Sequence, residues 1–570
     1  MITIYESKDI VEELEKKPDD SPKVKDKPLT KPAASNPGGL FSPFADKFLN
    51  ELGKEITLNE ENDQMVRVSE ALGGLVYIYE RIRNVIEYKG EDVLRRASIE
   101  RMIKRLLWER PRQDSKRVAE ALIKELIWSR YLPNNKIPNI KINEVAQIIE
   151  KYKYLLSNIQ KRKTVLSYSK LREWVWGIAS CEIEEAVDSV SNEEYIKLMH
   201  SWFMLYFEWT DKDVSQHEKD IQIYLAVHRS FAKSDDAIMR YHLILKEIPE
   251  WKKTEDTTTE KFVEEFPKLY NEIEKHLTHP DRLPLFRAVQ KQVAPFLIFK
   301  EFIEKEKDFQ KILNDPPSFE SHVYKLCETD YSKIRNKVNR GIVRSIIYIF
   351  ITKVLIVILL EAPYELFRFQ SLKFVPLAIN ISVPPLMMAL IGLTIRVPGE
   401  ENTRRIFNKL KTIVYLNEEI RKQNFSLKKT VRSARSSLVF SAVYLLLFGL
   451  VFGGISYILI QIDFTLLAIL VFFMFVSLVL LFGSRVRFTA SQLSVTPERE
   501  GLIKQVVDNL SLPLLSTGVY LSKGLAKLNF LGIILDFLIE APLKIIVEVI
   551  EEWTSYVREK REEVVEVPEE

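Results

Sequence analysis

The sequence LVFSAVYLLLFGLVFGGISYILIQIDFTLLAILVFFMFVSLVLLF, residues 438–482, decides the fold class of this chain. Its only charged residue is Asp463, and roughly 20 apolar residues are enough to carry a helix across a bilayer. The stretch therefore predicts two transmembrane helices, residues 438–460 and 464–482. Because only three residues separate these helices, we expect a tight hairpin with Asp463 at its outer tip.

Two further apolar runs, residues 341–360 and 374–397, precede this hairpin and are also long enough to span a bilayer. The sequence EAPYELFRFQSLK, residues 361–373, connects them as a second hairpin. The chain is thus predicted to be a multi-pass membrane protein with four spans.

Two features inside the spans predict how their helices pack. Pro376, Pro384 and Pro385 in the second span remove backbone donors, so we expect a kinked helix there. Gly453 and Gly454 in the third span lack side chains, so they predict close contact with a neighbouring helix.

Basic residues flank the apolar runs on one side of the predicted membrane. Cytoplasmic flanks of transmembrane helices are rich in Lys and Arg, and anionic headgroups attract such segments. The sequence therefore predicts an inner-membrane protein with both termini in the cytoplasm and anionic lipid as a partner of the basic connection, residues 398–437. The basic residues before the first span, in the connection and after the fourth span include Lys333, Arg335, Lys337, Arg340, Arg344, Arg404, Arg405, Lys409, Lys411, Arg485 and Arg487.

The chain before the spans divides into two parts. Residues 1–60 mix charges with Pro and Gly and contain too little apolar surface to fold, so we expect a disordered leader. Residues 65–331 have apolar residues at spacings of three and four, which predicts an all-helical cytoplasmic domain.

After the spans, residues 485–528 are interpreted as a cytoplasmic segment and residues 557–570 as an acidic tail. Residues 529–556 predict an amphipathic helix that lies in the membrane interface or docks on the bundle. The fold class predicted overall is all-α: a helical domain, four transmembrane helices and this last helix. The polar stripe of the last helix consists of Asp536, Glu540, Lys544 and Glu548, each four residues apart.

Lys353 and Glu361 are a candidate intramembrane polar site. Ionisable groups inside a membrane are costly, which favours a functional pair in the bundle interior. Alternatively, Lys353 extends its amine toward the outer surface and Glu361 lies in the outer loop. We favour the second interpretation because both residues belong to the outer half of the first span.

The histidine-containing stretch from His217 to His242 raises the question of a metal site. His217, His228, Asp235, Asp236 and His242 match no compact ligand spacing, so no metal is expected there. Cys181 and Cys327 are isolated, which argues against a disulfide framework or a zinc knuckle.

The sequence contains no glycine-rich phosphate loop, no GxSxG elbow and no HExxH motif, so neither a cofactor nor an enzymatic activity is predicted. The net charge of +3 gives no reason to expect nucleic acid as a partner. The leading hypothesis is a scaffold whose residues 65–331 dock a protein partner. The alternative is an ion or proton pathway through Lys353 and Glu361, in a bundle that forms a homo-oligomer.

Three segments carry a resemblance to a known family. The sequences YIYERIRNVIEYKGEDVLRRASIERMIKRLL (77–107), HRSFAKSDD (228–236) and ILDFLIEAPLKIIVEVIEEWTSYVREKREE (534–563) resemble an uncharacterised membrane-protein family of small-genome candidate-phyla bacteria. Ile534, Leu535 and Asp536, with the layout, resemble the plastid and cyanobacterial proton-extrusion family. That resemblance implies a cytoplasmic helical region before four spans, and neither resemblance assigns a role to any residue.

Overall fold

The computed structural model describes most of the chain. Of the described residues, 82% are helical and 2% lie in strands, which confirms the all-α class. Among these residues, four helices are long and apolar enough to cross a membrane. The described residues are 41–56, 65–68, 70–87, 93–109, 113–162, 166–187, 192–252, 256–415, 422–427, 434–495, 502–527 and single positions between 549 and 560.

The helical domain contains a first core, built mainly between residues 66 and 277. Its helices carry apolar residues at helical spacing, such as Val118, Leu122 and Leu126 of α5, and each of these is almost fully buried. The helices that build this core are α3 (Glu70–Glu87), α4 (Leu94–Glu109), α5 (Ser115–Trp128), α6 (Ile140–Lys161), α7 (Tyr168–Val187), α10 (Asp236–Glu247) and α11 (Asp256–Leu277).

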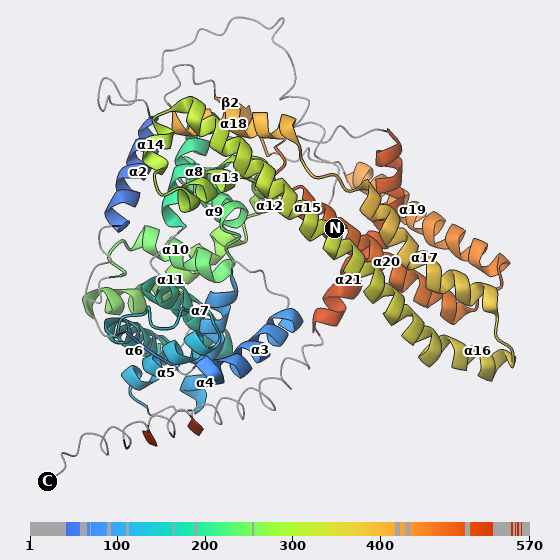
Figure 1. Cartoon of the computed structure of the whole chain (residues 1–570), viewed down its shortest axis with the longest axis horizontal. Coiled ribbons are helices and arrows are strands. Elements are labelled where there is room, and N and C mark those ends of the chain that lie inside the picture. Colours follow the sequence, from blue (N-terminus) through green and yellow to red (C-terminus); the bar gives the residue numbers. More distant parts are fainter. Residues whose placement is uncertain are drawn as a thin grey trace, which may run out of the picture.

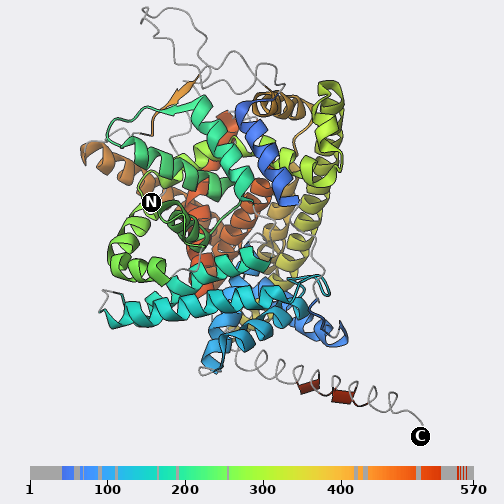
Figure 2. The same ribbon diagram turned by 90° about the vertical axis from the view of Figure 1, so that its left-hand side faces the viewer.

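A second core lies beside the first (Figure 2). Helix α9 (Gln216–Phe231) is shared, because Ile221 and Leu225 belong to the first core whereas Ile223 and Val227 belong to the second. The other elements of the second core before the spans are α2 (Pro43–Ile56), α8 (Glu193–Tyr206), β1 (Phe207–Trp209), α12 (Arg282–Gln290), α13 (Val293–Lys305), α14 (Phe309–Leu313) and the start of α15 (Pro316–Ile356).

The prediction of a disordered leader is wrong for residues 43–56, which form helix α2. Phe48 of this helix is 2% exposed and packs against Tyr195 and Phe299. Just before the helix, the Ser42 hydroxyl donates a hydrogen bond to the carbonyl oxygen of Ile413 at 2.6 Å. These contacts to distant residues supply the apolar burial that the local composition lacks.

The basic connection between the second and third spans also belongs to the second core. It contains α18 (Glu400–Val414), whose Ile406, Phe407 and Leu410 are almost fully buried there. It also contains β2 (Gln423–Phe425), which pairs in parallel with β1. The helical domain is therefore completed by residues that follow the first two spans in sequence.

One long helix joins the helical domain to the spans. Helix α15 starts in the second core and continues through a π-helical turn, η3 (Val357–Glu361), into α16 (Ala362–Phe369). Together these elements form an uninterrupted helix of 54 residues, Pro316–Phe369, which leaves the domain on one side (Figure 1). The predicted first span, residues 341–360, lies in the second half of this helix.

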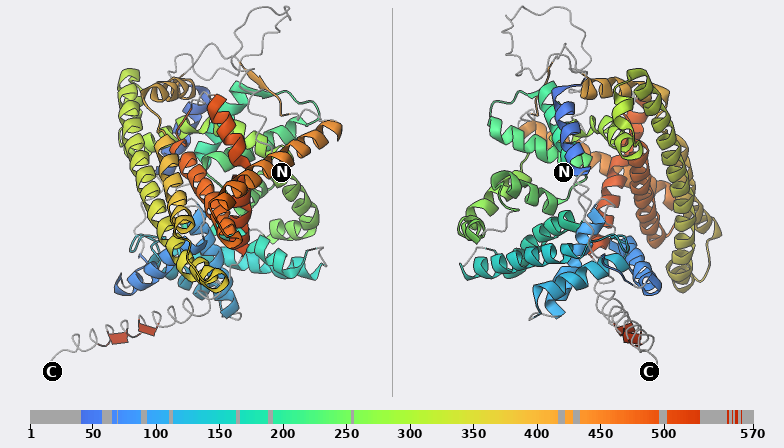
Figure 3. Two further views of the ribbon diagram at one scale, coloured as in Figure 1. Left: turned by 90° about the vertical axis from the view of Figure 1, so that its right-hand side faces the viewer. Right: turned by 60° about the vertical axis from the view of Figure 1, so that its left-hand side comes forward.

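The remaining spans are α17 (Phe374–Thr394), α19 (Ala434–Gln461) and α20 (Leu466–Ala490). Helix α17 stays one continuous helix through Pro384 and Pro385, and it lies along α15 (Figure 3). Helices α19 and α20 are joined by the expected tight turn, in which Asp463 has a φ angle of 64°.

Helix α20 is the central helix of the bundle. Of its most apolar 18-residue stretch, 61% is buried, compared with 6% for α19. Residues 485–528, predicted as a segment outside the membrane, contain α21 (Leu502–Lys527), which packs along α20. Residues 528–548, which hold the predicted stripe Asp536, Glu540, Lys544 and Glu548, lie outside the described residues.

Candidate functional site

Lys353 and Glu361 meet inside the four-span bundle. Both residues have an exposed fraction of 0%, and Lys353 Nζ lies 2.9 Å from Glu361 Oε1. The burial is provided by protein atoms, because the neighbouring helices cover both side chains. The favoured interpretation, in which Lys353 reaches the outer surface and Glu361 lies in a loop, is therefore wrong.

The π-helical turn explains how residues eight positions apart face each other. An α-helix turns by about 100° per residue, so eight residues would leave the two side chains about 80° apart. A π-helical turn inserts one extra residue into the helix, and the remaining rotation of about 700° places them within about 20° of each other. The π-helical turn Val357–Glu361 begins four residues after Lys353 and ends at Glu361.

Asn380 of α17 completes this polar site. Its Nδ2 donates to Glu361 Oε2 at 2.6 Å and lies 3.4 Å from the carbonyl oxygen of Ala468 in α20. Both oxygens of the Glu361 carboxylate are thus bonded, one by an ammonium group and one by an amide. Asn380 is 0% exposed, so three helices contribute to a site that water does not reach in this structure.

Helix α20 supplies the opposite wall of the site. Lys353 Nζ lies 4.8 Å from the centre of the Phe475 ring, within the range of a cation–π interaction. Among the described residues, the Asn380 Oδ1 atom has no hydrogen-bond partner. One polar atom beside the ion pair therefore has unused hydrogen-bonding capacity.

A second carboxylate lies one turn beyond the site. Glu365 of α16 is 1% exposed, and its Oε2 accepts a hydrogen bond from the backbone N–H of Lys373 at 3.1 Å. Its other oxygen, Oε1, has no hydrogen-bond partner in the described part of the chain. Glu365 and Glu361 are four residues apart on one helix, which places two acids between the bundle interior and the hairpin turn.

This arrangement is suited to proton exchange. An ammonium group that donates to a carboxylate forms either a charged pair or, after one proton moves, a neutral pair, and a low dielectric reduces the energy gap between the two states. Asn380 can hold the carboxylate in place in both states because its N–H donates to either form.

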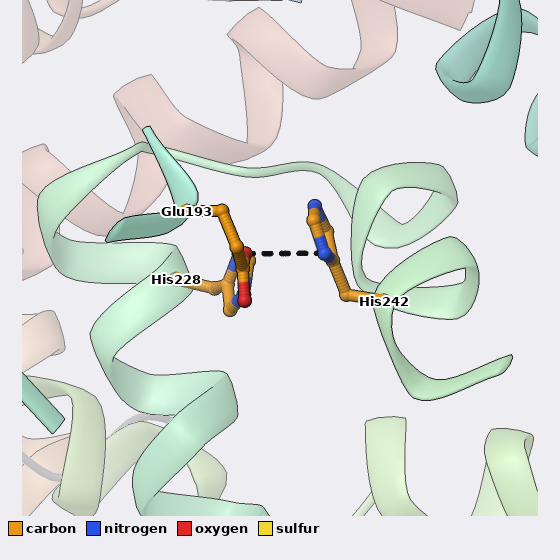
Figure 4. Close-up of side chains that lie close together, drawn as sticks. All are labelled: Glu193, His228 and His242. Carbon is orange, nitrogen blue, oxygen red and sulfur yellow. Dashed lines mark ion pairs between the residues drawn. The ribbon is translucent and has the colours of Figure 1, made fainter. Parts of the chain in front are cut away.

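The fold brings together only two of the five residues considered in the histidine-containing stretch. His217 is exposed, Asp235 caps helix α10 by accepting a hydrogen bond from Ile238 N, and Asp236 lies in the first turn of that helix. His228 and His242, however, are brought together, with their ring centres 4.6 Å apart. They flank Glu193, a residue that the sequence did not single out (Figure 4).

The site residues that the sequence missed are Asn380, Glu365 and Glu193. An asparagine in the second apolar run was a visible signal, since a polar amide inside a span needs a partner. Glu193 gave no signal, because its partners are 35 and 49 residues away in the chain.

No family model, curated protein or solved structure matches this chain.

Proposed function

We propose that the four-span bundle moves protons across a membrane and that Lys353, Glu361 and Asn380 form its proton-binding centre. The observation that supports this proposal is the fully buried pair of Lys353 and Glu361, 2.9 Å apart inside the bundle of apolar helices. Charged groups at such depth are rare and mark proton relays or ion pathways.

The buried groups suggest an order of proton transfers. Transfer of a proton from the Lys353 ammonium to the Glu361 carboxylate gives the neutral pair. Glu361 then passes this proton to the Glu365 carboxylate, and the neutral Lys353 amine takes up a proton from the opposite side of the membrane, which restores the charged pair. Glu365, whose Oε1 has no hydrogen-bond partner among the described residues, provides the next acceptor toward the hairpin turn. Four helices are few for a pathway, so the proposal includes a homo-oligomer, for which the exposed face of α19 offers an apolar surface.

We place this bundle in an inner membrane with the helical domain and both termini in the cytoplasm. The support is the basic hollow at the start of the first span, lined by Lys333, Lys337, Arg340, Gly341 and Arg344. This hollow suits anionic lipid headgroups. Cysteines introduced at Lys337 and Asp463 should react with a membrane-impermeant maleimide from opposite sides of sealed vesicles.

Proton flux into liposomes tests the proposed function. Purified full-length protein is reconstituted with a pH-sensitive dye inside the vesicles, and a potassium gradient with valinomycin drives proton entry. Wild-type protein should raise the rate of proton entry above that of protein-free liposomes, whereas the variants Glu361→Gln and Lys353→Met should not. Asp463→Asn, at the exposed hairpin turn, is the control and should keep the wild-type rate.

A wild-type rate equal to that of empty liposomes, in either direction of the gradient, contradicts the proposal. Equal rates for the wild type and Glu361→Gln contradict the assignment of the proton-binding centre even if flux is present.

The second candidate function is a docking platform formed by the helical domain. The supporting observation is the shared second core, in which α18 and β2 return from the spans and fix the domain to the bundle. A rigidly held domain suits the presentation of a surface to a protein partner. Chemical cross-linking in cells followed by affinity purification should recover a partner cross-linked to residues 65–331, and its absence would count against this function.

A further inference from the structure

A cluster of two histidines and one glutamate lies in the helical domain, apart from the intramembrane site. Glu193 is the first residue of α8, His228 belongs to the last turn of α9, and His242 lies in the middle of α10. One nitrogen of each ring and one oxygen of the carboxylate all lie within 4.8 Å of one another (Figure 4). The three side chains therefore converge on one point from three helices.

The distances between these atoms fit a common metal ligand geometry. Glu193 Oε2 lies 3.2 Å from His242 Nδ1 and 3.7 Å from His228 Nε2. Zinc bonds to nitrogen and oxygen of about 2.0–2.1 Å place two ligands of a tetrahedral site about 3.4 Å apart. Shifts of a few tenths of an ångström would bring both atom pairs to that separation.

Neighbouring groups orient two of the three ligands. The Tyr224 hydroxyl donates to Glu193 Oε1 at 3.0 Å, which directs Oε2 toward the histidines. Ser234 Oγ lies 3.2 Å from His228 Nδ1 and can hold the tautomer that leaves Nε2 free to accept. Metal-bound histidines are commonly fixed in this way through their other ring nitrogen.

His228 provides a second, independent observation. Its exposed fraction is 0%, and its Nε2 makes no hydrogen bond within the part of the chain that the structure describes. A buried ring nitrogen without a hydrogen bond is uncommon, because the loss of hydration is not offset. A metal ion that accepts this lone pair would account for it.

The protonation of the two rings also suits a metal ion, which binds neutral imidazole. Burial lowers the pKa of His228 well below its ordinary value, and the nearby His242 lowers it further. Burial also lowers the pKa of His242, although Glu193 opposes that change. Both shifts favour the neutral form of the ring, which is the form that a metal ion binds.

We propose that Glu193, His228 and His242 bind one divalent first-row transition metal ion, such as Zn²⁺. Two imidazoles and one carboxylate are a donor set that such ions accept. Three protein ligands leave a further position, which water fills from the side of Glu193 and His242, since these side chains are 20% and 16% exposed. The site is independent of the spans and of the function proposed for them.

The test uses full-length protein in detergent, stripped with a chelator and then titrated with Zn²⁺ against a chromophoric chelator. Wild-type protein should bind one equivalent and gain thermal stability with added metal. His242→Ala and Glu193→Gln should each lose about 100-fold in affinity, and Tyr224→Phe about 10-fold, because it removes only the orienting hydrogen bond. Added Co²⁺ should give the visible absorption of a four-coordinate site in the wild type but not in His242→Ala or Glu193→Gln.

His276→Ala is the matched control. His276 also pairs with a glutamate: its Nδ1 lies 3.0 Å from Glu218 Oε1. Because it lies outside the cluster, this substitution should leave the affinity for Zn²⁺ unchanged. Glu193→Gln keeps the side-chain shape, so circular dichroism can confirm that a lost affinity is not a lost fold. Wild-type protein that takes up no stoichiometric metal, or that loses no affinity in His242→Ala or Glu193→Gln, overturns the proposal. In that case the three side chains are packed neighbours only.

Discussion

At the scale of single residues, the Lys353–Glu361 pair shows how tightly a buried charge depends on its partner. Two charges removed from water are costly, and their mutual attraction repays that cost only when every remaining polar atom is bonded. Glu361 meets this condition through Lys353 and Asn380. Loss of either charge leaves the other without compensation.

Substitution of Glu361 by Gln should therefore destabilise the bundle by about 3–5 kcal/mol, because Lys353 is left buried and unpaired. The double variant Lys353→Met with Glu361→Gln should recover most of this loss, since no uncompensated charge remains. Unfolding by SDS titration in mixed micelles measures both values. If the double variant were as unstable as the sum of the single variants, the two residues would not be energetically coupled.

Lys409 is a partly buried amine outside the spans, in helix α18. Burial lowers its pKa to about 8, and its Nζ donates to Gln292 Oε1. The unfolded chain keeps the ordinary value near 10.5, so between about pH 8 and 10.5 the unfolded state binds more protons. The contribution of this group to folding stability consequently rises with pH across that window.

Lys409→Met should be more thermally stable than the wild type at pH 7, and the difference should shrink as the pH rises from 8 to 10.5. The physical reason is that the wild type must bury a charged amine at neutral pH and a neutral one at high pH. Thermal midpoints at pH 7 and pH 10 give the comparison. Arg404→Met, an exposed basic residue of the same helix, should show no such pH-dependent difference.

At the scale of elements, small residues decide which helices approach most closely. A Cβ atom added to Gly518 of α21 would lie 2.3 Å from the carbonyl oxygen of Ser477 in α20, too close for any side chain. Gly453 and Gly454, which the sequence suggested for this role, have nothing within 4 Å of such an atom among the described residues. Close packing therefore occurs between α20 and α21 rather than at α19.

Gly518→Ala should separate α21 from α20 and cost about 1–3 kcal/mol, the range for overpacking an interior contact. Gly524→Ala, in the same helix but facing open space, should instead stabilise by about 0.5–1 kcal/mol, because alanine favours the helix. Thermal unfolding of the two variants beside the wild type tests the contrast. Equal effects would mean that α21 does not pack on α20 as described.

At the scale of the whole molecule, segments that flank the spans belong to the core of the helical domain. Asn402 illustrates this: its Nδ2 donates to the Tyr331 hydroxyl at 2.8 Å and to the Leu493 carbonyl oxygen at 2.7 Å. Its Oδ1 also accepts from Val495 N at 2.7 Å. One side chain thus links helix α15, helix α18 and the segment after the last span.

A chain that ends at residue 331 should consequently fold only in part. The first core is complete without the spans, whereas the second lacks α18, whose Ile406, Phe407 and Leu410 are buried in it. Hydrogen–deuterium exchange should show protection of α5, α6 and α7 but fast exchange in α8 and α13. Full protection of α8 and α13 in the truncated chain would show that the second core does not need α18.

The helices and the spans can be predicted from the sequence because each is encoded by residues that are close together in the chain. Runs of about 20 apolar residues and apolar residues at helical spacing depend only on near neighbours in the chain. That is why the all-α class and the four apolar helices were predicted, and why Lys353 and Glu361 stood out inside one of them.

The partners of those residues were decided by the tertiary structure alone. Asn380 reaches Glu361 from another helix, and α2 and α18 gain a core from residues more than a hundred positions away. Such contacts depend on how helices pack, a property of shape that no local pattern encodes. The sequence therefore determined where helices form, and only the packing decided that Lys353 is buried in protein rather than directed to the surface.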